Sequence, residues 1–171
     1  ENDLDWGLLE EEEHQKMQHF VSDLNHFYQT HPALYRLDYD PDGFEWINSI
    51  SANENMLVFA RNTEKKEDTI LAVVNFSPMT YEKRKIGVPW SGKYKEIFNS
   101  DREEYGGSGA GNPRVKQSRK EECDGREHSI TITVPPMSVL FFAFAGTAPR
   151  AATNREAKAN YNKKKQEGRN G

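Results

Sequence analysis

A glycine-rich segment is the first feature of this sequence that could do chemistry. The stretch EYGGSGAGNPR, residues 104–114, holds four glycines in the six positions 106–111. A phosphate-binding loop needs a strand before it, a helix after it and usually a Lys-Ser/Thr pair at its end, so that backbone N–H groups meet the anion. Here an Asn-Pro pair follows, and the residues beyond it show no apolar periodicity. We therefore expect a long flexible connection between strands at 93–99 and 128–134, and no phosphate site.

Histidines and carboxylates are present, but their spacing does not suit catalysis or metal binding. The five histidines are His14, His19, His26, His31 and His128. His19 and His26 are seven residues apart, two helical turns, which is too far for one metal ion, and no HExxH motif occurs. Carboxylates that cleave glycosides must flank one bond across a cleft, which the run Glu10–Glu13 cannot do from one helix. No Ser-His-Asp or Cys-His arrangement is arguable either, so we predict no catalytic, metal or cofactor site.

The three tryptophans could stack on sugar rings. Trp46 falls within an apolar strand pattern, so we expect it in the protein core. Trp6 precedes the expected helix, at a position that no helix or strand period accounts for. Trp6 is therefore the aromatic residue whose role the fold does not explain.

Charge is unevenly distributed along the 171 residues, whose formal net charge is −4. Residues 1–13 contain seven acids and no base, whereas residues 146–171 contain seven Lys or Arg and two Glu. A basic tail can contact nucleic acid, but these bases are not interleaved with aromatic residues apart from Tyr161. Such a composition is typical of a solvated, disordered tail, so we predict no nucleic-acid partner.

Several features indicate the compartment. The longest apolar run, 139–145, is far too short to span a bilayer, and no secretory signal opens the chain. Cys123 is the only cysteine, so no internal disulfide or cysteine-based zinc site can form, which fits a reducing cytosol. We predict a cytoplasmic protein with no membrane partner. Because the first residue is Glu1 and not Met, we also expect a chain that is processed or cut from something longer.

Residues 10–30 are expected to form one amphipathic helix. Apolar residues recur there at helical spacing: Met17, Phe20, Val21, Leu24, Phe27 and Tyr28. The acidic run at its start complements the helix dipole, and Pro32 ends the helix because the residue before a proline is pushed out of the helical region. The apolar face is wide and aromatic, so something large must cover it.

After Pro32 the pattern changes to short strands. Candidate strands lie at 43–51, 55–62, 69–77, 83–89, 93–100, 128–136 and 138–146. Residues 130–134 alternate between apolar and Thr, whereas residues 138–146 are apolar on both faces and are therefore expected at the centre of a sheet. About seven strands without intervening helices predict a mainly β fold, an antiparallel β-sandwich that follows one amphipathic helix.

Three stretches carry a family resemblance. They are LDWGLL (4–9), LNHFYQTHPALYRLDYDPDGFEWI (24–47) and EYGGSGAGN (104–112), supported by ILAVVNFSP (70–78) and HSITITVPPMSVLFF (128–142). Together they resemble the C-terminal portion of bacterial 1,4-α-glucan branching enzymes, members of the α-amylase superfamily (glycoside hydrolase family 13). The likeness covers roughly residues 3–144, and the pair DPDGFEWI and YGGSGAGN points to branching enzymes within that superfamily.

The resemblance implies a domain organisation. Residues 1–32 would be the last loop and last helix of a (β/α)8 catalytic barrel, residues 33–145 the α-amylase C-terminal all-β sandwich domain, and residues 146–171 a basic, disordered tail. The partner of this chain would then be the parent's own catalytic barrel. The catalytic carboxylates would lie upstream of Glu1, so the chain alone would be inactive.

The resemblance also implies an activity. The parent enzyme, a hexosyltransferase of glycogen biosynthesis, would transfer an α-1,4-glucan segment to a 6-hydroxyl to form an α-1,6 branch, with retention of configuration and no cofactor. Its partners would be α-1,4-glucans such as glycogen and amylose. Trp6, in the loop after the eighth barrel strand, would be a substrate-binding residue that stacks on a sugar face, or would instead pack that loop against the sandwich.

Two other interpretations stay open. The lack of catalytic residues is equally expected of a non-catalytic glucan-binding or structural β-sandwich module. The chain could also be the C-terminal domain of another α-amylase relative, a debranching or trehalose-releasing enzyme.

Overall fold

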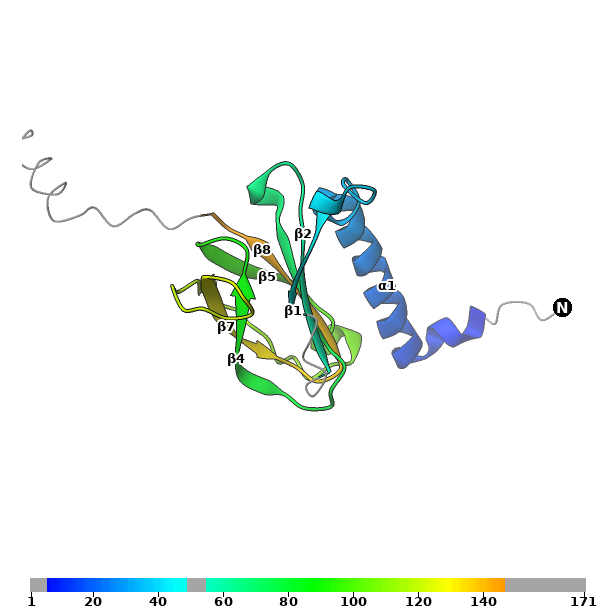
Figure 1. The fold of residues 1–171 in the computed structure, drawn as a ribbon. Helices are drawn as coiled ribbons and strands as arrows, with labels where there is room; N and C mark the ends of the chain where they lie inside the picture. The colour runs from blue at the N-terminus through cyan, green and yellow to red at the C-terminus, as the bar shows by residue number, and fades with distance from the viewer. Residues whose placement is uncertain (1–5, 49–54, 147–171) are drawn as a thin grey trace, which may run out of the picture.

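The computed structural model describes residues 6–48 and 55–146 (Figure 1). Short 3-10 turns are η1 (Trp6–Glu10), η2 (Pro32–Leu34), η3 (Pro41–Gly43), η4 (Lys66–Asp68) and η5 (Glu103–Tyr105). The helix is α1 (Glu12–Thr30). The strands are β1 (Phe44–Asn48), β2 (Met56–Arg61), β3 (Ile70–Asn75), β4 (Tyr81–Val88), β5 (Lys93–Asn99), β6 (Lys116–Gln117), β7 (His128–Val134) and β8 (Ser138–Phe144). The predicted tail at 146–171 lies outside the described residues except for Gly146.

The strands form two antiparallel sheets. The larger sheet has the order β1-β2-β3-β8-β5-β6, and the smaller one pairs β4 with β7. Strand β8 lies between β3 and β5, which confirms its predicted central position. Helix α1 lies on one side of the larger sheet, and β4 and β7 lie on the other side (Figure 1). The predicted mainly β fold with one N-terminal helix is therefore confirmed.

The core between the two sheets follows from the period of two along each strand. Met56, Val58 and Ala60 are buried and alternate with partly exposed residues in β2. Strand β7 buries its apolar positions Ile130, Ile132 and Val134, as its alternation predicts. Burial of one such side chain contributes about 1.5–3 kcal/mol, so this inter-sheet core is the main source of the sandwich's stability.

A second apolar cluster joins α1 to the outer face of the larger sheet. Phe27 is buried there, with its ring centroid 5.0 Å from that of Phe141 and 5.2 Å from that of Phe98. Phe20 and Leu24, on the same side of the helix, pack against this cluster. The sandwich itself therefore covers part of the helix face that the sequence predicts to need a large partner.

The remaining part of the predicted apolar helix face is uncovered. Met17, Val21 and Tyr28 are exposed, Met17 by 61%. The helix begins at Glu12, two residues later than predicted, because η1 occupies the residues before it. It ends at Thr30, ahead of Pro32 as expected.

The prediction that Trp46 lies in the core is wrong. Its side chain is 49% exposed, whereas the next residue, Ile47, is buried. Strand β1 is the edge of the larger sheet, so the face opposite to the core is open there. Successive side chains of a strand point to opposite faces, and Ile47 takes the inward position. The sequence also gave no sign of β6, which has only two residues.

The helix-to-sheet cluster makes a testable prediction. Replacement of Phe27 by Ala should lower the free energy of unfolding by about 3 kcal/mol, because a buried ring is lost and a cavity remains. The matched control is Met17→Ala on the exposed side of the same helix, which should change it by less than about 0.5 kcal/mol. Urea unfolding followed by tryptophan fluorescence measures both values, and equal effects would contradict this account of how α1 packs.

Candidate functional site

The glycine-rich loop is folded upon itself. The backbone N–H groups of Gly106 and Gly107 donate to the carbonyls of Glu103 and Arg102, at 2.9 and 3.0 Å. The N–H of Gly109 donates to the Asp101 carbonyl at 2.8 Å. A Cβ on Gly107 would lie 2.3 Å from the Asp101 carbonyl carbon, so only glycine permits this approach. The N–H groups of Gly106, Gly107 and Gly109 therefore form hydrogen bonds within the loop itself.

The predicted flexibility of this loop does not fit its contacts. Asn112 is buried, and its backbone N–H and side-chain Nδ2 both donate to Glu96 of β5, at 2.9 and 2.8 Å. The same Nδ2 donates to the Thr133 carbonyl in β7, and Asn112 Oδ1 accepts from the Thr133 N–H. One asparagine therefore links a strand of the larger sheet to a strand of the smaller one.

The loop also reaches α1 through Tyr105. Its hydroxyl donates to Asp23 Oδ2 at 2.6 Å, and its ring meets that of Phe20 edge-on, with centroids 5.3 Å apart. Burial, together with the hydrogen bond to Asp23, raises the pKa of Tyr105 to about 12. The glycine-rich loop thus holds the helix against the sandwich, which is a structural role.

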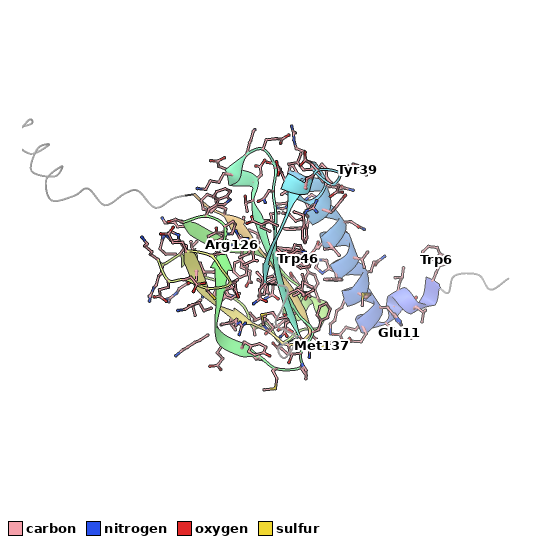
Figure 2. All side chains as sticks on the ribbon, in the orientation of Figure 1. Trp6, Glu11, Tyr39, Trp46, Arg126 and Met137 are labelled. Atoms are coloured by element: carbon pink, nitrogen blue, oxygen red, sulfur yellow. The ribbon has the colours of Figure 1, made fainter. Side chains whose placement is uncertain are left out.

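Trp6 lies on η1 at the far end of the helix from the strands (Figure 2). Its side chain is 72% exposed, and it lines an open apolar groove of about 390 Å³. The other residues of this groove come from η1 and the first half of α1: Leu8, Leu9, His14, Met17, Gln18 and Val21. We call this surface the η1–α1 groove. It continues the uncovered side of α1 and contains no residue of the sandwich.

A second aromatic surface, which the sequence did not predict, lies on β1 and β2. The ring centroids of Phe44 and Trp46 are 4.9 Å apart, those of Phe44 and Phe59 are 5.2 Å apart, and those of Trp46 and Phe59 are 5.9 Å apart. We call these three residues the aromatic platform; Figure 2 labels Trp46. The signal that could have found it is the adjacent pair Trp46-Ile47, since only one of two successive strand residues can face a core.

The aromatic platform continues into a groove beside α1. The groove has a volume of about 420 Å³ and is lined by Leu24, Asn25, Tyr28, Leu34, Phe59, Arg61 and Phe141. Phe59 belongs to both surfaces. Trp46, Phe59 and Ala72 are register partners across β1, β2 and β3, and Ala72 is fully buried. Exposure therefore increases along this row toward Trp46, which is half-exposed on the edge strand.

Within residues 6–48 and 55–146, no three His, Cys, Asp or Glu side chains lie together so that they could hold a metal ion. His14 pairs with Glu11, and His19 pairs with Asp23, both along α1. The thiol of Cys123 is partly buried, and burial together with Asp124 raises its pKa to about 11, which leaves it a poor nucleophile. Within the same residues, no helix is long and apolar enough to cross a membrane.

The sandwich with its N-terminal helix has the architecture of an amylase-type terminal domain, and comparison with known families agrees. Residues 46–145 match the family described as "Alpha amylase, C-terminal all-beta domain". The chain belongs to this family, as its resemblance to α-amylase relatives predicts.

Individual relatives are more specific. The chain is 43% identical over 141 residues to 1,4-alpha-glucan branching enzyme GlgB 1 of Clostridium perfringens, covering 82% of this chain and 21% of that protein. It is 41% identical to the GlgB branching enzyme of Oceanobacillus iheyensis, covering 82% and 22%. It is 39% identical to that of Halothermothrix orenii, covering 81% and 22%. The predicted resemblance to branching enzymes is confirmed, and the chain spans about a fifth of the length of these relatives.

The Tyr105–Asp23 hydrogen bond should give stability a specific pH dependence. Because the pKa of Tyr105 rises from its ordinary value of 10 to about 12, the folded protein holds this proton more tightly than the unfolded chain. The stabilisation is therefore complete below pH 10 and is lost as the pH rises through about 12.

The test compares the wild type with Tyr105→Phe by urea unfolding from neutral pH upward. At neutral pH the variant should be less stable by about 1 kcal/mol, since one hydrogen bond is missing. The difference in the free energy of unfolding between the two proteins should narrow above pH 10. Only the wild type has a Tyr105 hydroxyl, whose stabilising contribution is lost as the hydroxyl ionises. A difference that stays constant up to pH 12 would show that the hydroxyl is not held as described.

Proposed function

We propose that this chain is the C-terminal region of a 1,4-α-glucan branching enzyme, a hexosyltransferase that moves an α-1,4-glucan segment to a 6-hydroxyl during glycogen biosynthesis. The observation that carries the proposal is the identity of 39–43% to proteins named as branching enzymes. This identity extends over 139–141 residues, a longer stretch than residues 46–145, so it is not limited to the sandwich.

The division of the chain at residue 32 is part of the proposal. Residues 1–32 would complete a catalytic barrel, residues 33–145 would form the sandwich domain, and residues 146–171 would be a basic tail. The two sides of α1 support this arrangement. Phe20 and Phe27 pack on the sandwich, whereas Met17 and Val21 face outward with the η1–α1 groove. About four-fifths of the length of the relatives lies outside their match to this chain. The barrel is the proposed occupant of that outward surface.

The proposed glucan contacts are aromatic. The aromatic platform supplies an exposed Trp46 whose ring is fixed by two neighbours, and a sugar face packs well on such a ring. Trp6 remains the proposed contact from the barrel side, since its ring is free to meet a ligand. Catalysis itself would need the carboxylates of the barrel, with no cofactor.

Compartment and partners follow from the same proposal. We place the protein in the cytoplasm, and its single cysteine, which can form no internal disulfide, fits a reducing compartment. Its partners would be α-1,4-glucans and its own barrel, without nucleic acid or membrane. A second candidate function, a non-catalytic glucan-binding module, is favoured by one observation, the exposed aromatic platform on the sandwich.

The activity is tested by linkage analysis of amylose treated with the longer protein that carries this chain. New α-1,6 linkages support the proposal, whereas loss of α-1,6 linkages from glycogen would indicate a debranching enzyme. The 171-residue chain alone should add no branches, because the catalytic carboxylates of the proposed parent enzyme would lie on its barrel, outside this chain. Any rise in branch content with the chain alone would overturn this assignment of catalysis to the barrel.

Glucan binding by the chain itself is tested by affinity electrophoresis in gels that contain glycogen or amylose. Trp46→Ala should weaken retardation by at least about fivefold, because it removes the most exposed ring of the aromatic platform. Tyr39→Ala is the matched control, since Tyr39 is fully exposed and lies away from Trp46 (Figure 2). Equal retardation of the wild type and Trp46→Ala would contradict the sugar site, and a loss with Trp6→Ala alone would move it to the η1–α1 groove.

A further inference from the structure

Two basic segments that are distant in the sequence line one groove on the outer face of the smaller sheet. The first is KRK at 83–85 in β4, and the second is RVKQSRK at 114–120, which contains β6. Backbone hydrogen bonds between Arg119 and Ser129 of β7, at 2.9 and 3.1 Å, hold the second segment beside the sheet. The groove between them has a volume of about 760 Å³, within the range of ligand sites. We call it the basic groove.

The cationic character of the basic groove is not neutralised by its own carboxylates. Lys83, Lys116 and Arg119 line it, and Glu121 is the acidic residue among its lining side chains. Glu121 pairs with Lys85 at 2.6 Å and lies 3.9 Å from Arg119. Among the described residues, Lys83 and Lys116 have no carboxylate within ion-pair distance. The groove therefore keeps an excess of positive charge on a chain whose net charge is −4.

The rest of the lining narrows the ligand class. Thr131, Ser129 and Gln117 supply polar groups, and Val115 is the apolar residue. No aromatic side chain lines the groove, so nothing there can stack on a nucleobase as single-stranded nucleic-acid sites do. A neutral glucan carries no negative charge that could pair with the three cationic side chains of the groove, so it is not the expected ligand. Cations beside hydroxyl and amide groups suit a ligand that carries both a phosphate and sugar hydroxyls.

We propose that the basic groove binds a phosphate ester of a sugar, with Lys83 and Lys116 on the phosphate and Thr131 on a hydroxyl. The ester can be a free hexose phosphate or a phosphate carried on a glucan chain. Strands β4 and β7, which carry Lys83 and Thr131 of the groove, lie on the far side of the larger sheet from α1 (Figure 1), so a ligand in the groove leaves the helix face uncovered. This inference is independent of the proposed branching activity and of the aromatic platform.

The test titrates the 171-residue chain, labelled with ¹⁵N, with glucose 6-phosphate, with glucose and with inorganic phosphate at millimolar concentrations. Glucose 6-phosphate should shift the amide signals of Lys116, Arg119 and Thr131, and glucose should not. The double variant Lys83→Gln/Lys116→Gln should weaken binding by about tenfold or more, because two charge-assisted contacts are lost. Added salt should weaken binding in the wild type, since the groove is open to solvent.

Lys95→Gln is the matched control, since Lys95 is an exposed lysine of β5 outside the groove. The proposal is overturned if glucose 6-phosphate does not bind, or if it binds equally well to the double variant. Affinity electrophoresis then separates the two sources of phosphate. Retardation by phosphorylated amylopectin that the double variant loses indicates a glucan-borne ester, whereas binding of glucose 6-phosphate without such retardation indicates a free ester. Trp46→Ala should leave the ¹⁵N titration unchanged, so failure of the aromatic platform and failure of the basic groove are distinguishable.

Discussion

The structure depends on how one helix is attached to one sheet. The ring of Phe27 packs against those of Phe98 and Phe141, so α1 and the larger sheet share a buried aromatic cluster. This cluster includes side chains of strands β3, β5 and β8. The same three strands also contribute side chains to the core on the other face of the sheet. A shift of the helix would expose rings on one face of the sheet, so helix and sandwich behave as one packed unit.

The glycine-rich loop secures the same attachment with polar contacts. Close backbone contacts at Gly107 fold the loop onto Asp101, Asn112 ties it to both sheets, and Tyr105 extends from it to Asp23 on the helix. The glycines of this loop allow one stretch of backbone to approach another closely, because they have no side chain. They do not make the loop mobile. The glycine-rich segment resembles a phosphate-binding loop in the sequence, but its Gly107 and Asn112 are explained by the contacts that fold the loop and join it to the sheets.

Local sequence patterns predicted the helix and most strands well, because helix ends and the alternation of a strand depend on residues close together in the sequence. The alternation of Ile130, Ile132 and Val134 identifies β7, and Pro32 marks the end of α1. The adjacent pair Trp46-Ile47 indicates that only one of the two side chains faces the core, but which one does so depends on how the edge strand β1 pairs with β2. The basic groove was missed for a similar reason, because residues 83–85 and 114–120 meet only after the two sheets stack.

The three surfaces lie on different parts of the fold, and this separation follows from the layer order. The larger sheet is covered on one face by α1, except toward the edge strand β1, and on the other face by β4 and β7. The edge strand and the outer face of the smaller sheet are therefore open to ligands. The aromatic platform occupies the edge strand, the basic groove occupies the outer face, and the η1–α1 groove extends from the helix. Neither the aromatic platform nor the basic groove shares a residue with the η1–α1 groove, on which we propose that the barrel packs. A terminal domain could then hold a long glucan on one side and a charged ligand on another without obstructing the contact with its own barrel.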